Sequence, residues 1–472
     1  MFVGRDHELT QLQRLLKRGR SSLVVCRGRR RIGKSTLVEE FGKGTPRFYE
    51  FQGLPPRPGM TNVAQLDHFA AAMADQFDLP RLKIESWADA FALLANQTRV
   101  GPTVVLLDEI SWMARKDPDF AGQLKIAWDT KFKNNDRLIL VLCGSVSSWI
   151  DRNVLRNAGF VGRVTLNIKL DELPLALCSA FWGKRAGRVS AREKFRLLSV
   201  TGGVPRYLEE IDPSESAANN IKAMCFDPAG LLFSEFDLIF EDTFSSRAVI
   251  YRRVVEALVA GPKGLKSICK NLGVAPSGVT SEYLSDLEQS GFIARDFVFS
   301  TKTGRKGKLS RYRLCDNYVR FYLKYVAPRT DAIEKGLFRF RDLDSLAGFD
   351  SMMGLQLENL VLRNLPDVLE KLGIPSASVI SASPYFQNAT RRKQACQIDL
   401  LVHTKSALFV CEVKSTKKVG LDVVSEVAEK IRRLSYPRHL SIRPVLIYLG
   451  DLVPHVEEEC FFDRLLSLDS LL

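Results

Sequence analysis

The chain has 472 residues, of which 46% are hydrophobic and 26% charged, and its formal net charge is +14. These values indicate a globular protein of two to four domains, and the lack of any run of about 18 apolar residues argues against a membrane-spanning helix. The positive charge favours a polyanionic partner, nucleic acid first, and nine scattered cysteines without a Cys-x-x-Cys pair indicate free thiols in the cytoplasm and not disulfides or a zinc site.

The first elements along the chain surround a phosphate-binding motif. A helix with an apolar face is predicted over residues 7–19, and residues 23–37 contain an apolar strand, a glycine-bounded loop and the start of a second helix. The loop fits G-x-x-x-x-G-K-[ST], in which glycines turn N–H groups toward a phosphate, the lysine reaches the β- and γ-phosphates, and the hydroxyl ligates Mg²⁺. The motif predicts binding of ATP or GTP through Gly28, Gly33, Lys34, Ser35 and Thr36.

Further strands and helices alternate along the first third of the chain. Strands are predicted at residues 47–51, 103–109, 138–145 and 164–170, and helices at residues 62–78 and 86–99. This alternation predicts a parallel sheet with helices on both faces. The strand at 47–51 comes between the phosphate-loop strand and the next strand along the chain, which suggests the additional-strand class of P-loop ATPases.

Two carboxylates end the strand at 103–109. Asp108 is expected to hold the Mg²⁺ shell and Glu109 to polarise the attacking water, while Ser145 at the tip of a later strand contacts the γ-phosphate or that water. A strand that merely ends in charge is the alternative. The preceding phosphate loop favours the metal site, because both motifs serve the same chemistry.

Five segments in a fixed order carry a family resemblance. FVGRDHEL, GRRRIGKST, LLDEI, CGSV and TGGVPRYLEE together resemble the AAA-related, STAND-like prokaryotic ATPases often called the archaeal ATPase family. The resemblance implies that the first segment lies near the adenine and that Pro205 begins a lid helix beside the nucleotide. It also implies that Arg163 contacts γ-phosphate within a subunit or between subunits of a homo-oligomer. An ordinary surface arginine is the alternative for Arg163.

A winged helix is expected in the middle of the chain. Its predicted elements are three helices and a hairpin, at residues 251–261, 264–273, 275–291, 292–300 and 308–314. The third helix would enter a DNA major groove and the wing would contact phosphates, through Ser277, Thr280, Ser281, Tyr283, Lys302, Arg305, Lys306 and Lys308. Packing against protein is the alternative, because Glu282, Asp286 and Glu288 on the third helix would repel phosphate.

Near the C-terminus, the sequence places two carboxylates and a lysine together. Strands are predicted at 378–386, 395–403 and 407–415, and a two-residue turn at Lys405-Ser406 pairs residue 404 with residue 407. Asp399 then lies directly opposite Glu412, and Lys414 shares their face of the sheet. Such opposed carboxylates repel unless a cation neutralises them, and Mg²⁺ is suited to that role.

This arrangement resembles the PD-(D/E)XK, or restriction-endonuclease-like, nucleases. The resemblance implies that Asp399, Glu412 and Lys414 form the catalytic motif and that Glu358, on a helix predicted over 353–372, completes the shell of Mg²⁺ or Mn²⁺. Ile398 replaces the proline of the motif. A salt bridge from Lys414 to Glu412 or Asp399 is the structural alternative.

The sequence therefore predicts an α/β multidomain protein that hydrolyses ATP, binds double-stranded DNA and controls a DNA endonuclease. Analogy with the resembled families extends this to defence against foreign DNA. A regulatory switch whose ATP state controls oligomerisation, and a DNA remodeller that does not cut, are the alternatives. The expected parts are a P-loop ATPase core at 1–170, a helical lid and connector at 171–247, a winged helix at 248–315, a connecting helix at 316–345 and a nuclease-like domain at 346–472.

Overall fold

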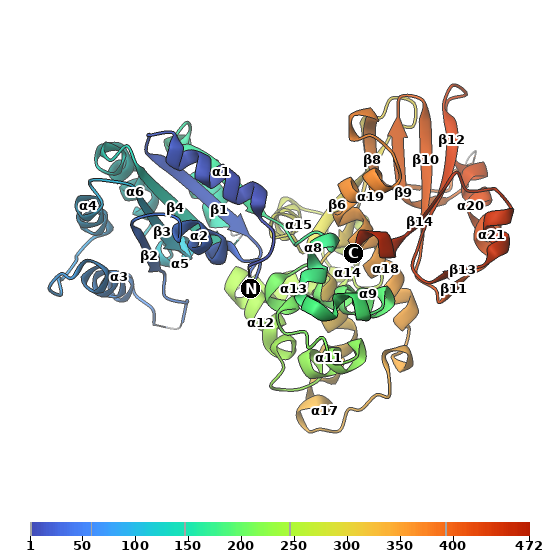
Figure 1. Ribbon diagram of the computed structural model, residues 1–472, viewed down its shortest axis with the longest axis horizontal. Coiled ribbons are helices and arrows are strands. Elements are labelled where there is room, and N and C mark those ends of the chain that lie inside the picture. The colour runs from blue at the N-terminus through green and yellow to red at the C-terminus, as the bar shows by residue number, and fades with distance from the viewer. Residues whose placement is uncertain (1, 58, 146–147, 245–246, 392–393) are drawn as a thin grey trace. The chain divides into compact units, whose positions relative to one another are not determined.

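The computed structural model in Figure 1 describes residues 2–57, 59–145, 148–244, 247–391 and 394–472. The chain divides into two compact units, the first made of residues 1–172 and 241–245 and the second of residues 173–240 and 246–472. The expected lid, winged helix and C-terminal domain thus fall almost wholly in one unit. None of the helices in these parts of the chain combines the length and the apolar character that crossing a membrane requires.

A parallel sheet forms the centre of the first unit. Its strands are β1 (Ser22–Gly28), β2 (Phe48–Gln52), β3 (Thr103–Asp108), β4 (Leu138–Ser145) and β5 (Val164–Leu170). They lie in the order β2-β3-β4-β1-β5, and every neighbouring pair is parallel. Since β2 is an edge strand, it is β4 that separates β1 from β3 in the sheet, and not the strand at 47–51.

Helices cover the sheet of the first unit (Figure 1). The Thr61 and Ser86 side chains cap α3 and α4 by accepting hydrogen bonds from backbone N–H groups three residues further on. Trp87 of α4 and Phe120 of α6 meet edge to face in the core, with ring centroids 4.8 Å apart. The helices are α1 (Asp6–Lys17), α2 (Lys34–Gly42), α3 (Asn62–Phe77), α4 (Trp87–Gln97), α5 (Ile110–Met113), α6 (Phe120–Thr130) and α7 (Ser148–Ile150).

The segment after residue 172 is mainly helical up to a hairpin. The part expected as a connector, residues 212–247, forms two helices because Leu232, Phe236 and Phe240 recur at helical spacing and are buried. The helices are α8 (Leu175–Cys178), α9 (Ala191–Thr201), α10 (Pro205–Leu208), α11 (Ala217–Cys225), α12 (Leu231–Phe244), α13 (Ala248–Glu256), α14 (Leu265–Leu272) and α15 (Gly278–Gln289). The antiparallel hairpin consists of β6 (Ile293–Phe299) and β7 (Lys306–Leu314).

A second sheet forms the C-terminal part of the second unit, in the order β14-β12-β10-β9-β8. Strands β8, β9 and β10 are antiparallel, whereas β12 and β14 continue parallel to β10. The strands are β8 (Val379–Gln387), β9 (Cys396–Thr404), β10 (Ala407–Lys414), β12 (Ser441–Tyr448) and β14 (Arg464–Ser467), with a separate pair β11 (Lys418–Val419) and β13 (Asp451–Leu452).

The helices of this part are α16 (Asn317–Phe321), α17 (Thr330–Glu334), α18 (Phe349–Arg363), α19 (Leu365–Lys371), α20 (Asp422–Arg433) and α21 (Pro454–Glu458). The helix predicted over 353–372 is divided at Asn364, because Pro366 lacks the N–H that an uninterrupted helix would use. Helix α20 packs on β10 through Val423 and Val427, which contact the hydrophobic cluster around Leu408.

Buried side-chain amides join α18 to two earlier helices. The fully buried Gln356 donates from Nε2 to the carbonyls of Ser199 on α9, at 2.8 Å, and of Asn317 on α16, at 2.7 Å. One turn further on, Asn359 donates to Asn317 Oδ1 at 3.0 Å and to the Leu314 carbonyl at 3.1 Å. A buried amide that lost such partners would keep the full cost of its desolvation, so these bonds fix the position of α18.

The β6–β7 loop lies on the C-terminal sheet. Ser381 of β8 donates a hydrogen bond to the Gly304 carbonyl, and Thr301 donates to the Ser435 carbonyl at 2.7 Å. Gly304 has φ 67°, and a Cβ atom there would lie 2.3 Å from Cγ2 of Ile380. Any other residue at 304 would therefore push the loop away from β8. The basic side chains of the loop nevertheless remain exposed: Lys302, Arg305, Lys306 and Lys308.

The nine cysteines are all unpaired, as expected from their spacing. Eight are buried, and Cys460 is exposed.

Candidate functional site

The predicted phosphate loop joins β1 to α2 at the carboxyl edge of the first sheet. Gly28 ends β1 and pairs with Ser145 of β4 and with Leu170 of β5. Gly33 precedes α2 with φ 85°, a left-handed conformation that glycine adopts without strain. The loop is thus followed directly by a helix N-terminus, where backbone N–H groups and the helix dipole favour an anion.

Lys34 and Ser35 are both held in place by groups within this unit. Lys34 is 6% exposed and donates from Nζ to the Arg29 carbonyl at 3.2 Å, so its ammonium stays against the loop. Ser35 donates from Oγ to Asp108 Oδ2 at 2.8 Å. The hydroxyl and the carboxylate that were expected to share a Mg²⁺ ion therefore already lie together. Thr36 is exposed in the first turn of α2.

The side chains of Asp108 and Glu109, at the end of β3, have different hydrogen-bond partners. Asp108 is 3% exposed, and its Oδ1 accepts the Glu109 N–H at 3.0 Å. Glu109 has φ 48°, and its carboxylate accepts hydrogen bonds from the N–H and the hydroxyl of Ser145, each at 3.4 Å. The structure thus brings the predicted water-activating carboxylate to the predicted Ser145 at the same sheet edge.

Arg5 links the N-terminal segment to this edge, although sequence reasoning gave it no contact. Its Nη2 donates to the Asp171 carbonyl at 2.7 Å and to the Ile32 carbonyl of the phosphate loop at 3.4 Å. Its backbone adopts φ 67°. The signal for this residue was the FVGRDHEL segment, which places an arginine directly before the first helix.

Arg163 lies at the opposite edge of the sheet from the phosphate loop. It directly precedes β5, whose first residue, Val164, pairs with Leu23 near the start of β1, five residues before Gly28, so Arg163 is one strand residue further from the loop. At about 3.3 Å per strand residue, that edge is roughly 20 Å from the loop. Arg163 instead forms a double ion pair with Asp129 of α6, with both N–O distances 2.8 Å. Contact with a γ-phosphate bound to the same subunit is therefore excluded, and contact between subunits stays a prediction.

Pro205 is the first residue of α10, in agreement with the prediction that a helix begins at this residue. The turn before it is fixed by a hydrogen bond of 2.8 Å from the Leu173 N–H to the Gly203 carbonyl. Both residues belong to the second unit, and the role of Pro205 beside a nucleotide stays a prediction.

The β9–β10 hairpin has the register that its two-residue turn predicts. Leu408 pairs with His403 and Cys411 with Leu400, so the next opposed positions are Glu412 and Asp399. Asp399 is half-buried, and its Oδ2 accepts the Val413 N–H at 2.8 Å. Glu412 is 3% exposed.

Two lysines neutralise Glu412 from the face that α20 covers. Lys414 Nζ lies 2.9 Å from Glu412 Oε1, and Lys430 of α20 forms an ion pair with Glu412 Oε2. Glu426, one helical turn before Lys430, pairs with both lysines, at 2.7 Å to Lys414 and 3.1 Å to Lys430. The salt bridge considered as the alternative for Lys414 is thus present. Sequence reasoning missed Lys430 and Glu426, although their spacing on an amphipathic helix after the E-x-K strand was visible.

The carboxylates remain electrostatically strained despite the lysines. Burial and the nearby Glu358 carboxylate raise the pKa of Asp399 to about 7, against the opposing effect of Lys430. Burial and repulsion from Asp399 raise the pKa of Glu412. Burial also raises the pKa of Glu358, to which Glu412 contributes. The carboxylates of Glu358, Asp399 and Glu412, from α18, β9 and β10, therefore raise one another's pKa values.

The three carboxylates supply the hard oxygen donors that Mg²⁺ or Mn²⁺ prefers. As they stand, no three His, Cys, Asp or Glu side chains within the described ranges are grouped closely enough to hold a metal ion. At Glu412 the cations in contact are instead lysine ammonium groups. These oxygen donors suit a divalent ion. An ion that bound Glu412 would displace at least one of its two lysine partners.

The raised pKa of Asp399 makes the stability of the metal-free protein depend on pH. The folded state keeps this proton up to about pH 7, whereas the unfolded chain releases it near its ordinary value of 3.8. Between these values the folded state binds more protons, so stability falls as the pH rises from about 4 to 7. Asp399→Asn should lose less stability than wild type between pH 5 and pH 8, by at most about 3 kcal/mol, because about two pH units below the folded pKa contribute about 1.4 kcal/mol each.

Urea unfolding at both pH values, in EDTA and without nucleotide, measures this difference. Asp331→Asn, which changes an exposed carboxylate in the same unit, should follow wild type. Equal pH dependence for Asp399→Asn and wild type would show that Asp399 is ionised in the folded protein.

Comparison with known proteins identifies the first part of the chain. Residues 2–211 match a family described as an ATPase domain predominantly from Archaea. The walker-type ATPase PABY2304 of Pyrococcus abyssi has a similar structure, with a TM-score of 0.50 and 16% identity over 68% of this chain and 96% of that one. The first part of the chain thus matches an ATPase domain and has the fold of a P-loop ATPase, in agreement with the ATP binding and hydrolysis predicted from the phosphate loop.

Two proteins of Methanocaldococcus jannaschii are similar in sequence. The uncharacterized protein MJECL04 is 24% identical over 421 residues, which cover 88% of this chain and 87% of that protein. The uncharacterized ATP-binding protein MJ0423 is 42% identical over 41 residues, which cover 9% of this chain and 70% of that protein.

Proposed function

We propose that the chain is a DNA-binding ATPase that controls a metal-dependent endonuclease site in its C-terminal domain. One observation carries this proposal: Asp399, Glu412 and Lys414 share one face of the β9–β10 hairpin, and Glu358 approaches from α18. Buried acids that raise one another's pKa values weaken a fold unless they serve a ligand. A divalent metal would be held by the three carboxylates, and a DNA phosphate would be contacted by Lys414.

The order of elements around these residues supports the same proposal. Apart from the short elements α19 and β11, a helix, three antiparallel strands, a second helix and a parallel strand follow one another as α18, β8, β9, β10, α20 and β12. This is the order expected from the resemblance to PD-(D/E)XK nucleases, with the acids on the second and third of the antiparallel strands. The likeness of fold is analogy, and the side chains carry the functional argument.

At the ATPase site, each residue has a distinct role. Lys34 neutralises charge on the β- and γ-phosphates, and the loop N–H groups orient them. Ser35 and Asp108 would hold Mg²⁺. Glu109, held by Ser145, would accept the proton of the attacking water. Arg163 could reach γ-phosphate only on a neighbouring copy, so a homo-oligomer is part of the proposal.

At the nuclease site, Asp399 and Glu412 would hold Mg²⁺ or Mn²⁺, with Glu358 supporting them. When bound, the metal supplies an electrophile for the phosphate and a more acidic water. Lys414 is placed to orient the nucleophile or to stabilise charge on the phosphate. Lys430 neutralises Glu412 when no metal is bound. Incubating purified full-length protein with plasmid DNA, Mg²⁺ or Mn²⁺, and with or without ATP tests the proposal, which predicts cutting.

The winged-helix interpretation of residues 248–315 supports binding of double-stranded DNA. Replacing Lys302, Arg305, Lys306 and Lys308 by alanine should weaken binding and reduce its salt dependence, since each lost phosphate contact removes about 0.9 from the slope of log K against log salt. Fluorescence anisotropy at several salt concentrations measures both effects. The matched control is Arg438→Ala, an exposed cation in the same unit. Equal slopes for wild type and the quadruple variant would exclude the loop from the DNA interface.

A second candidate function rests on the two lysines. Because Lys414 and Lys430 neutralise Glu412 without a metal, the C-terminal domain could act as a binding module of an ATP-dependent switch or DNA remodeller. In the plasmid assay, retarded but uncut DNA would indicate a remodeller. Neither retardation nor cutting would indicate a switch that controls oligomerisation.

A further inference from the structure

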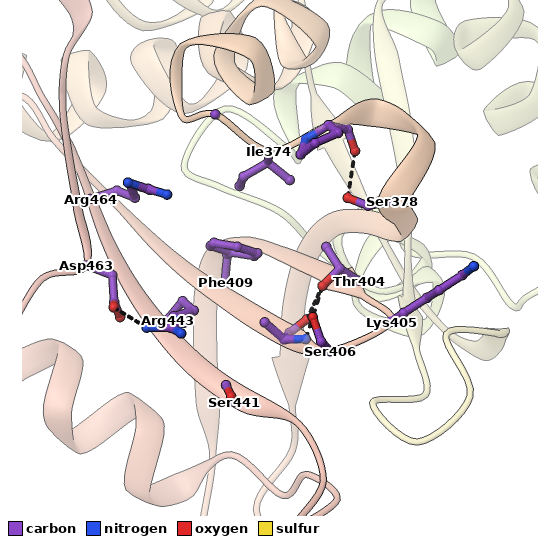
Figure 2. Close-up of a pocket in the computed structure, with 13 residues that line it drawn as sticks. Ile374, Ser378, Thr404, Lys405, Ser406, Phe409, Ser441, Arg443, Asp463 and Arg464 are labelled. Atoms are coloured by element: carbon purple, nitrogen blue, oxygen red, sulfur yellow. Dashed lines mark hydrogen bonds and ion pairs between the residues drawn. The ribbon is translucent and has the colours of Figure 1, made fainter.

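A pocket of about 630 Å³ opens on the C-terminal sheet, away from both sites described above. It lies between the turn after α19 and the first residues of β10 and β12, with β14 on one side (Figure 2). Phe409 of β10 contributes to its wall, whereas Glu412 is three positions further on and projects from the other face of the strand. The volume is within the range of small-ligand sites.

Phe409 gives the pocket an apolar wall. Figure 2 shows the side chain of Ile374 on one side of the Phe409 ring, and Ile374 is itself only 3% exposed. Phe409 is only half-buried although its neighbours Leu408 and Val410 are at most 1% exposed. A flat ring inserted here would cover the exposed face of Phe409, and stacking of this kind is how aromatic side chains hold nucleobases.

The charged side chains that line the pocket favour an anionic ligand. Lys405, Arg443 and Arg464 line the pocket together with a single acid, Asp463. Arg443 pairs with Asp463 at 2.7 Å, which leaves the charges of Lys405 and Arg464 uncompensated by any ion pair within the described parts of the chain. Figure 2 shows Arg464 directed from β14 toward the space above Phe409, whereas Lys405 lies on the opposite side and its side chain extends away from Phe409. Arginine and lysine are the side chains that bind phosphate groups.

We infer that this pocket binds a nucleotide, with its base against Phe409 and its phosphate near Arg464. The aromatic wall suits a flat apolar group, and the uncompensated cations suit an anionic group. Nucleotides combine both groups in one molecule. A free nucleotide and the terminal nucleotide of a DNA strand share this chemistry. The inference is independent of the proposed nuclease, since it uses none of the residues assigned to metal or phosphate at that site.

The test uses full-length Lys34→Ala protein, so that nucleotide binding at the ATPase site is suppressed. Isothermal titration calorimetry with AMP, ATP, a 5′-phosphorylated oligodeoxynucleotide and the same oligonucleotide without phosphate should give saturable binding of at least one phosphorylated ligand. Binding of AMP or ATP would identify a free nucleotide as the ligand. Binding of the phosphorylated oligonucleotide alone would identify a strand end.

Two further substitutions in this background locate the binding. Phe409→Leu keeps the apolar packing but removes the stacking ring, and Arg464→Gln removes a charge from an exposed position; each should weaken binding about tenfold. Arg438→Gln, at another exposed arginine, should leave affinity unchanged. Melting curves verify folding of each variant. The inference is overturned if no phosphorylated ligand binds, if Phe409→Leu and Arg464→Gln bind as tightly as their parent, or if inorganic phosphate binds as tightly as the nucleotides.

Discussion

Lys34→Ala should abolish measurable ATP hydrolysis and weaken ATP binding by about 100-fold or more. The ammonium is buried against the phosphate loop, and it is the cation that the loop motif provides for the β- and γ-phosphates. Replacing a charge-assisted contact with a methyl group in a buried site removes several kcal/mol of binding free energy. Calorimetry with a non-hydrolysable ATP analogue and a phosphate-release assay measure the two effects.

Glu109→Gln is the matched comparison for this variant. The amide is isosteric, so ATP should still bind, while turnover should fall by about 10²- to 10⁴-fold through loss of the general base. Similar binding losses in Lys34→Ala and Glu109→Gln would show that Glu109 acts in binding and not on water. Turnover at the wild-type rate in Glu109→Gln would remove it from the catalytic step.

Asp399→Ala should reduce the rate of DNA cutting by roughly 10²- to 10³-fold, while the rate of ATP hydrolysis stays close to that of wild type. Loss of a carboxylate ligand removes several kcal/mol of metal-dependent stabilisation from the cleavage step. Asp399 and the phosphate loop lie in different compact units, so the nucleotide site keeps all its residues. Plasmid nicking and phosphate release in the same preparation measure both activities. Lys414→Ala should lose cutting in the same way.

Metal binding without DNA separates a direct role of Asp399 from damage to the fold. In nucleotide-free protein, Mn²⁺ should raise the melting temperature of wild type by mass action and raise that of Asp399→Ala less. Without metal and above pH 7, where Asp399 is ionised, Asp399→Ala should be as stable as wild type or slightly more stable, because it relieves a carboxylate pair. If metal stabilises both proteins equally and neither cuts DNA, Glu412 and Lys414 form only a structural salt bridge.

Local chemistry allowed the central parts of both sites to be predicted from the sequence. The phosphate loop needs only its own residues and a strand and helix around it. The opposition of Asp399 and Glu412 follows from counting outward from a two-residue turn, because side chains in paired strands alternate with a fixed period. Such features depend on neighbours in the chain and not on the packing of distant segments.

The features that the sequence did not predict depend on how distant segments pack. Lys430 reaches Glu412 only because Val423 and Val427 place α20 over that face of β10. The docking of Gly304 against β8 likewise joins residues that are 77 positions apart. For Arg163, strand direction alone excluded the same-subunit interpretation, since this residue precedes its strand whereas Gly28 ends one.

The amide bonds of α18 bear on how this chain could have acquired its C-terminal domain. Gln356 and Asn359 lie on either side of Glu358, and their partners include the backbone carbonyls of Ser199 on α9, of Leu314 at the end of β7 and of Asn317 on α16. A recombination event that exchanged residues 346–472 as a cassette would leave those carbonyls facing new side chains. A replacement domain would therefore need side-chain donors at the positions of Gln356 and Asn359 to keep these buried carbonyls hydrogen-bonded.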